Sequence, residues 1–440
     1  MSFDPEVYRA RRARIFEAME RVGGGALLLP AADERTRNND NVYLFRQDSD
    51  YAWAVGLDEP TGCALFLARR GERKLILFVR PRDREKEIWN GVRAGVDGAR
   101  ETYLAHDAYV VSEMDTRLPG LLDGAPTLWF RIGWDAAWDA RLARILVELR
   151  AGARTGKRPP EAVVDSGRVL HELRLVKAPD EIALLRRAAD ITAEGHLAAM
   201  RDGIDGRREH QVQAEIEYAF RRRGGNGPGF DTIVAAGPSS TILHYRAGEG
   251  VLKDGEVCLV DAGGEYQWYT ADVSRTFPVS GEFTSAQRDL YALCLAVQKQ
   301  AIAAVRPGTT LEAIHEAVVR RITEGLIGMG LLKGTADERI EDKSFRKYYM
   351  HRTSHWLGMD VHDAGEYHDQ DGKPRPLIPG MVLTVEPGIY VPVDDEAAPV
   401  GLRGVGIRIE DDVLVGEEGP VNLTEAIPKE IAEVEAACAR

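Results

Sequence analysis

Three of the chain's ten histidines lie within thirteen residues, at His351, His355 and His362. Imidazole binds divalent metals and transfers protons near neutral pH, so this density indicates a functional stretch; the alternative is three unrelated histidines on a polar loop. The first two have the four-residue spacing of a helical zinc motif, but Arg352 stands where that motif has its glutamate. The threonine, serine and glycine nearby are poor helix formers. We therefore expect a looped segment whose further metal ligands come from elsewhere.

Carboxylates end several apolar segments in the second half of the chain. The run 257–260 leads into Asp261, and the run 381–385 leads into Glu386. In the alternating segment 405–410, Arg408 and Glu410 face one side of a strand and the apolar residues face the other. A buried carboxylate is costly unless it is paired or bound to metal. These segment ends therefore predict ligand positions.

A hairpin is expected to supply a further carboxylate. Asp261 and Asp272 are symmetric about the point between Tyr266 and Gln267. A hairpin with its tip there would place the two carboxylates opposite each other, about 5 Å apart at Cβ. Such a pair is tolerated where a cation lies between the two groups. The alternative is that one aspartate caps a turn and the other is solvated.

Together these positions form a candidate metal centre of one imidazole and four carboxylates: Asp261, Asp272, His355, Glu386 and Glu410. A hard, oxygen-rich set of this kind suits Mn²⁺, Co²⁺ or another catalytic divalent ion better than a structural zinc site. Four negative charges balance two divalent cations. The chemistry expected is that of a dinuclear hydrolase, with a bridging hydroxide as nucleophile between metals about 3.5–4 Å apart.

At 440 residues the chain is too long for one ordinary core, so at least two domains are expected. Alternating helices and strands predict a mixed α/β domain in the first part. The helices are expected at 5–22, 85–92 and 135–151, and the strands at 26–30, 63–68, 74–79 and 127–132, with a hairpin turn at 69–73. Proline and acids at 179–181 open a new helix, which places the boundary between domains 1–174 and 175–440.

The second domain carries a weak internal repeat. Helix pairs are expected at 181–201 with 209–223, and at 284–305 with a helix opened by the Thr309-x-x-Glu312 capping box. Their joints, at Gly203 and Gly308, lie 105 residues apart. A β-rich run follows each pair, at 232–276 and 380–415. Two such halves would leave a cleft between them; the alternative is chance similarity between helical hairpins.

Composition excludes several classes of partner. The formal charge of −13 argues against binding to nucleic acid or to an anionic membrane, since both require basic patches. The four cysteines lie far apart without a CxxC pair, which indicates reduced thiols in a cytoplasmic protein. The polar N-terminus has no signal-peptide core, and no apolar run is long enough to span a bilayer.

The ordered ligand set resembles the metal signature of the pita-bread metallopeptidases, which include methionine aminopeptidase, prolidase and aminopeptidase P. Within that family, residues 351–363 are similar to the signature of the proline-specific members. The runs from Asp261 to Tyr266, 384–390 and 406–412 fit as well. Residues 45–50 and 56–60 resemble the N-terminal domain of aminopeptidase P, which methionine aminopeptidases lack. The resemblance implies a small mixed α/β N-terminal domain followed by a pita-bread α+β domain with pseudo-twofold halves.

The resemblance also implies a role for each metal ligand. Asp272 and Glu410 would bridge two metals, Asp261 would bind one of them, and His355 with Glu386 would bind the other. Glu386 would in addition carry the proton from the bridging water to the leaving nitrogen.

Further residues would serve the substrate. His362 would donate a hydrogen bond to the developing oxyanion, and its alternative is a structural histidine. His244 and His351 would hold the proline side of the substrate. The substrate-binding candidates are Tyr390, Arg408 and Trp89. Arg408 would orient a metal carboxylate or form a plain salt bridge, and Trp89 resembles a tryptophan supplied by a neighbouring subunit or is an ordinary helix aromatic.

The activity implied is that of a metal-dependent exopeptidase that removes an N-terminal residue preceding proline. Two divalent ions are expected, Mn²⁺ first, with Co²⁺ or Zn²⁺ as alternatives, in a homo-oligomer (dimer or tetramer). The rival is prolidase, which applies the same chemistry to dipeptides. More distant rivals are a non-catalytic binding protein on this fold and a metal-free hydrolase resembling creatinase, and the complete ligand set disfavours both.

Overall fold

The computed structural model describes residues 4–69, 71–202 and 205–439. The chain divides into two compact units, Met1–Leu173 and Arg174–Arg440, and our boundary between 174 and 175 lies one residue later. Two positions of our predictions, Arg70 in the hairpin turn and Gly203 at the first helix joint, lie outside the described residues.

The first unit is built on a six-stranded sheet in the order β6-β5-β4-β1-β7-β8. The strands are β1 (Gly25–Pro30), β4 (Cys63–Arg69), β5 (Glu72–Val79), β6 (Asp107–Val110), β7 (Thr127–Trp129) and β8 (Ala162–Val164). β4 is antiparallel to both its neighbours, and the outer strands are parallel to theirs. The predicted β4–β5 hairpin is confirmed, whereas the strand predicted at 127–132 ends at Trp129.

Helices and one short hairpin complete the first unit. They are α1 (Pro5–Arg21), α2 (Ser49–Val55), α3 (Arg84–Asn90), α4 (Gly95–Glu101), α5 (Met114–Leu122), α6 (Ala136–Ala151), α7 (Gly167–Leu175, which runs into the second unit), β2 (Thr36–Asn38) and β3 (Asn41–Val42). Asp135 caps α6 by accepting hydrogen bonds from the backbone of Ala137 and Trp138, as expected of an aspartate at this position. The mixed α/β character of this unit is therefore confirmed.

The second unit has two helical hairpins, α8 (Pro179–Asp202) with α9 (Glu209–Arg222), and α10 (Ser285–Ala303) with α11 (Leu311–Gly328). Thr284 and Gln287 form the predicted capping box of α10. The predicted box of α11 is wrong: Thr310 is the N-cap and accepts from Ala313. Glu312 instead pairs with the guanidinium of Arg352 at 2.9 Å and takes no part in the cap. Two short helices, α12 (Ala336–Glu341) and α13 (Ile431–Cys438), follow.

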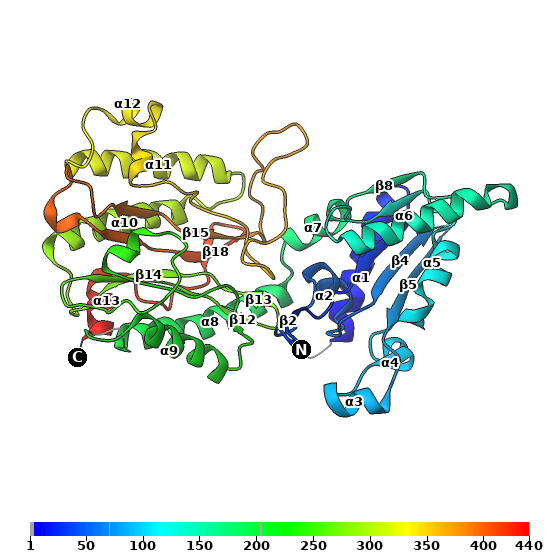
Figure 1. Cartoon of the computed structure of the whole chain (residues 1–440). Helices are drawn as coiled ribbons and strands as arrows, with labels where there is room; N and C mark the ends of the chain where they lie inside the picture. The colour runs from blue at the N-terminus through cyan, green and yellow to red at the C-terminus, as the bar shows by residue number, and fades with distance from the viewer. Residues whose placement is uncertain (1–3, 70, 203–204, 440) are drawn as a thin grey trace. The chain divides into compact units, whose positions relative to one another are not determined.

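Antiparallel strands follow each helical hairpin. One sheet contains β10 (Ile233–Ala236), β11 (Val257–Asp261) and β14 (Ser274–Pro278), and another contains β15 (Val382–Val385), β18 (Asp411–Val415) and β19 (Pro420–Asn422). β16 (Gly388–Val391) pairs with β17 (Val405–Arg408), and β12 (Gly264–Tyr266) pairs with β9 (Gly227–Pro228) and β13 (Tyr269–Thr270). Figure 1 shows α8 and α9 along one side of these strands and α11 along the opposite side.

The expected register of the Asp261 hairpin is wrong. The turn lies at Gln267 and Trp268, one residue later than predicted, so Asp261 pairs with Ser274 instead of Asp272. Both turn residues have positive φ, 48° and 69°. This is the conformation of a hairpin turn that glycine or asparagine normally supplies, and the sequence therefore gives no local signal for it. Asp272 lies in the irregular link between β13 and β14.

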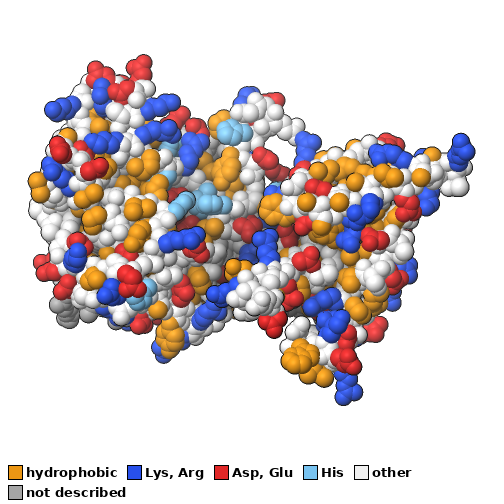
Figure 2. All heavy atoms as spheres, in the orientation of Figure 1, with side chains coloured by type: hydrophobic (Ala, Val, Ile, Leu, Met, Phe, Trp, Pro, Cys, Tyr) orange, Lys and Arg blue, Asp and Glu red, His pale blue; other side chains and the backbone are white. Residues whose placement is uncertain are grey.

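Acidic and basic side chains are mixed over the face of the molecule shown in Figure 2.

Within the described residues, every helix is too short or too polar to serve as a membrane span.

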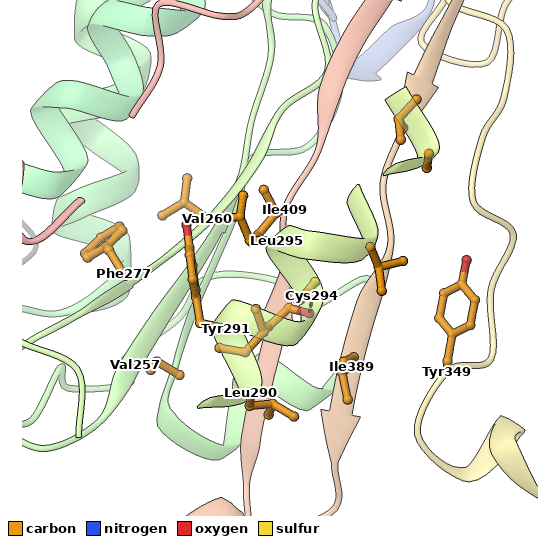
Figure 3. Close-up of a cluster of buried hydrophobic side chains, with 14 of the residues drawn as sticks. Val257, Val260, Phe277, Leu290, Tyr291, Cys294, Leu295, Tyr349, Ile389 and Ile409 are labelled. Atoms are coloured by element: carbon orange, nitrogen blue, oxygen red, sulfur yellow. Dashed lines mark hydrogen bonds between the residues drawn. The ribbon is translucent and has the colours of Figure 1, made fainter. Parts of the chain in front are cut away.

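The core of the second unit lies beneath its strands. Figure 3 shows Tyr291, Cys294 and Leu295 of α10 facing Val260 of β11 and Ile409 of the link between β17 and β18, and all of these side chains are buried. The thiol of Cys294 also donates to the carbonyl of Pro387 at 3.3 Å. The core therefore fixes the turn that follows Glu386.

Candidate active site

Strand ends deliver the candidate ligands, as predicted. Asp261 is the last residue of β11, Glu386 directly follows β15, and Glu410 lies between β17 and β18. The histidine segment has no helix, as expected, and runs alongside β15: the amide of Thr384 donates to the carbonyl of His355 at 3.0 Å. Because the loop is tied to the strand in this way, His355 is held at the same place as the carboxylates.

The structure brings the five candidate ligands together. Asp272, His355 and Glu410 each offer a ligand atom within 4.8 Å of the others. The imidazole Nε2 of His355 also lies 3.6 Å from Glu386 Oε1, and Asp261 lines the same cavity. This cavity, of about 1000 Å³, is lined by residues of the second unit alone.

The hydrogen bonds of His355 define its tautomer. Its Nδ1 lies 3.1 Å from the carbonyl oxygen of Trp356, and since a carbonyl can only accept, Nδ1 carries the proton. The other ring nitrogen, Nε2, faces carboxylate oxygens, with Asp272 Oδ2 at 3.4 Å. A histidine whose Nδ1 donates to a carbonyl presents its Nε2 in the way that is usual for a metal ligand.

Burial and mutual repulsion shift the pKa values of the carboxylates in the cluster. Burial, and then the charge of Asp261, raises the pKa of Asp272 well above its usual range. Burial and the charge of Asp272 do the same for the pKa of Glu410. Burial raises the pKa of Glu386 to about 7, although the nearby His355 opposes the shift. These carboxylates resist ionisation together because they are buried close to one another.

The residues present fit divalent metal. Asp261 Oδ1 is buried and has no hydrogen-bond partner among the described residues, while its Oδ2 accepts from Arg408 at 2.8 Å. An unpartnered buried carboxylate oxygen is costly in the protein alone, and it is a ready ligand for a cation. Asp261 Oδ1 and His355 Nε2 together make this donor set suitable for one or more divalent ions.

Arg408 organises one wall of the site. Its guanidinium donates to Asp261, to Ser274 Oγ at 2.7 Å and to the hydroxyl of Tyr390 at 3.0 Å. Ser274 in turn donates to Glu410 Oε2 at 2.7 Å. The guanidinium is buried with Glu410, on the face predicted from the alternation, and it links two of the candidate ligands.

The three other histidines predicted for the site, His244, His351 and His362, line the cavity. His351 Nδ1 donates to its neighbour's carbonyl at 2.8 Å, and its Nε2 accepts from the hydroxyl of Tyr390 at 2.9 Å. Burial, and then Arg408, lowers the pKa of His351 to about 3, so this imidazole is neutral. The ring of His362 lies 4.4 Å from that of His355.

Two predicted substrate residues lie outside the cavity lining. Tyr390 is buried behind His351 and Arg408, with 1% of its surface exposed. Trp89 belongs to α3 of the first unit and is 86% exposed. Any contact of Trp89 with substrate therefore stays a prediction.

Sequence reasoning missed some participants. Asp412, two residues after Glu410, accepts from the amide of the candidate ligand Asp272 at 3.2 Å. His315 lines the cavity, and its Nδ1 contacts the hydroxyl of Thr353 at 2.9 Å. The acidic pair that follows Glu410 was a usable signal for Asp412, whereas a lone histidine on an amphipathic helix gives none.

A buried cluster of carboxylates and imidazole on an α+β scaffold, opening into a substrate-sized cavity, defines the class of metal-dependent hydrolases. Family comparisons agree with this class. Residues 183–417 match the model of metallopeptidase family M24, and residues 8–129 match the aminopeptidase P N-terminal domain. The chain belongs to metallopeptidase family M24.

Similar proteins align with nearly all of the chain. The Xaa-Pro aminopeptidase of Escherichia coli is 41% identical over 98% of this chain and 96% of its own length. Human Xaa-Pro aminopeptidase 3 is 35% identical over 92% of this chain and 78% of its own. The solved structure of Pseudomonas aeruginosa aminopeptidase PepP, 41% identical, superposes with a TM-score of 0.95 over 99% of this chain and 98% of that one. The structure of zinc-substituted E. coli aminopeptidase P in complex with product is 40% identical and superposes with a TM-score of 0.95 over 100% of this chain and 99% of that one. The fold expected from the sequence is thereby confirmed.

Proposed function

We propose that this protein is an Xaa-Pro aminopeptidase, which hydrolyses the first peptide bond of substrates with proline in second position. The observation that carries the proposal is that one cavity is lined by all five candidate ligands and by the three other predicted histidines. Full-length relatives named Xaa-Pro aminopeptidase support it, as does a related structure solved with product.

Five residues are proposed to hold two divalent ions: Asp261, Asp272, His355, Glu386 and Glu410. Asp272, His355 and Glu410 would hold metal together, since their ligand atoms lie within 4.8 Å of one another. When bound, the ions supply activation of water and polarisation of the scissile carbonyl. Mn²⁺ is the metal we propose, since carboxylate oxygens dominate the donor set.

The protein's own groups move the protons. Glu386 is proposed to accept the proton of the attacking water and to return it to the leaving nitrogen of proline. His362, in the same cavity, donates a hydrogen bond to the oxyanion as the carbonyl carbon becomes tetrahedral. His244 and His351 hold the proline side. Tyr390 acts on the substrate indirectly, because its hydroxyl donates a hydrogen bond to the imidazole of His351.

The cavity's cations favour an aminopeptidase over a prolidase. A dipeptidase must capture the free carboxylate of its substrate's proline, for which a fixed and available cation is needed. Arg352 is paired with Glu312 at 2.9 Å, and Arg408 is buried against Asp261. Arg246 is 89% exposed and so provides no closed carboxylate pocket. Substrates that continue past proline fit this arrangement better than dipeptides.

The experiment compares an Xaa-Pro-Xaa tripeptide with the matching Xaa-Pro dipeptide, with and without Mn²⁺. We expect kcat/KM for the tripeptide to be higher by at least about tenfold, equivalent to about 1.4 kcal/mol of transition-state binding. Better turnover of the dipeptide would replace the proposal with a prolidase. Arg352→Gln would then be the first variant to make, since a prolidase would need that cation for the substrate's carboxylate.

A homo-oligomer, either dimer or tetramer, is also proposed. Trp89, Ile88 and Val92 are exposed by 86%, 76% and 77% in and just after α3, and apolar residues gathered in this way are typical of protein interfaces.

The cytoplasm is the compartment we propose, on the basis of four buried cysteines without disulfides.

A further inference from the structure

The loop that carries His244 needs an anchor. Residues 242–250 contain no helix or strand, and His244 itself is exposed. A histidine on an irregular loop can bind a substrate productively only when the loop is held in place, because misplacement by about 1 Å can cost about a hundredfold in rate.

A buried carboxylate on a helix provides this anchor. Glu209 is the first residue of α9 and has no exposed surface. Its Oε2 accepts from the hydroxyl of Tyr245 at 2.8 Å and from the amide of Gly248 at 3.1 Å. Its Oε1 accepts from the amide of Ala236, at the end of β10, at 3.0 Å. One side chain therefore joins the helix, the strand and the loop.

The residues around Glu209 pack closely and keep the loop 242–250 next to the start of α9. The amide of Glu209 donates to the carbonyl of Gly250 at 2.9 Å, and a Cβ on Gly250 would lie 2.5 Å from the Glu209 carboxylate carbon. Tyr245 and Leu243 pack against a small cluster that includes Tyr390. The two neighbours of His244 in the chain are therefore held on the same buried surface.

We propose that Glu209 is a positioning residue for His244: its carboxylate fixes the loop 242–250 through Tyr245 and Gly248. The inference rests on the proposed function, in which His244 holds the proline side of the substrate. Glu209 does not line the cavity, so it acts on the substrate only through the loop.

The first test is a double-mutant cycle on the metal-loaded full chain with a Xaa-Pro-Xaa tripeptide. Glu209→Gln keeps the size of the side chain but replaces one acceptor oxygen with a donor. We expect it to lower kcat/KM by about tenfold or more. In a His244→Ala background it should change kcat/KM by less than about twofold, because both changes remove the same contribution.

A matched control comes from the same helix. Glu217 accepts a hydrogen bond from Gln213 within α9, and Glu217→Gln should leave kcat/KM within about twofold of the wild type, as distant surface changes do. If Glu209→Gln fails to fold, Tyr245→Phe takes its place in the cycle and should show the same loss of effect beside His244→Ala.

The second readout does not depend on activity. Arg246, within the loop, is 89% exposed, so trypsin cleavage after it reports loop opening. We expect native-state cleavage there to be at least about fivefold faster in Glu209→Gln than in Glu217→Gln.

Two results would overturn the positioning role: a Glu209→Gln loss that multiplies with that of His244→Ala, or cleavage after Arg246 at an unchanged rate. A wild type that turns over no Xaa-Pro peptide would refute the proposed function instead, and the trypsin rates would still decide whether Glu209 holds the loop.

Discussion

Replacing Asp363 by asparagine should strongly destabilise the second unit. Its carboxylate, 1% exposed, lies 2.9 Å from Lys177 Nζ and 2.6 Å from Arg174 Nη2, and both cations are buried, with 1% and 4% of their side chains exposed. Asp363→Asn would leave two buried positive charges without their shared counter-charge. Breaking a buried ion pair costs about 3–5 kcal/mol, a large share of a typical stability of about 5–15 kcal/mol.

The same arginine provides the control. Asp360 also pairs with Arg174, at 3.0 Å, but its side chain is 39% exposed. Solvent screens such a pair, so Asp360→Asn should cost less than about 1 kcal/mol. Urea unfolding of the metal-free chain, followed by hydrogen exchange in peptides of the second unit, measures both losses. Equal losses in the two variants, or a loss below about 1 kcal/mol for Asp363→Asn, would refute the argument from burial.

The pH dependence has a definite sign. Burial alone would raise the pKa of Asp363, but Lys177 and Arg174 outweigh it and lower that pKa below its ordinary value. A depressed folded-state pKa stabilises the fold above the unfolded pKa of about 3.9 and loses this effect as the pH falls further. The difference between wild type and Asp363→Asn should therefore be constant from about pH 7 to pH 5 and shrink only below about pH 4. A difference that shrinks between pH 7 and pH 5 would show that another group is responsible.

Three further predictions concern the proposed reaction and assembly. Glu386→Gln should lower kcat by about 10²–10⁴-fold with little change in KM; a variant that keeps more than about a tenth of wild-type kcat would contradict the proton-carrying role, and the exposed Glu417→Gln is its control. Chelation should abolish activity, and Mn²⁺ at about 100 times its Kd should restore it and stabilise the chain by about 2.7 kcal/mol in thermal melts; full activity or an unchanged melt in a verified metal-free sample would exclude the metal centre. Trp89→Ala should change stability by less than about 0.5 kcal/mol, since the side chain is 86% exposed, yet shift the chain to a smaller species in sedimentation velocity. An unchanged species would remove Trp89 from the interface.

Much of the candidate site could be predicted from the sequence because its signals are local. Apolar runs that end in Asp261 and Glu386 mark strand ends, and alternation alone places Arg408 and Glu410 on one face. A cluster of histidines in a segment with poor helix formers predicts a loop without any knowledge of its neighbours. Each of these inferences uses only residues within a few positions of one another.

The tertiary structure decided the contacts that no local pattern encodes. Gln267 and Trp268 adopt positive φ without glycine, so the register that sets Asp261 against Ser274 depends on surrounding packing. Arg174 donates a hydrogen bond to Asp363, which lies 189 positions away in the chain. Glu209 accepts a hydrogen bond from Tyr245, which lies 36 positions away. A buried charge needs a partner, and the amino-acid sequence alone determines that need. Which distant group satisfies it depends on how the folded chain brings helices and loops together, because the energy of such a pair depends on distance and burial in space.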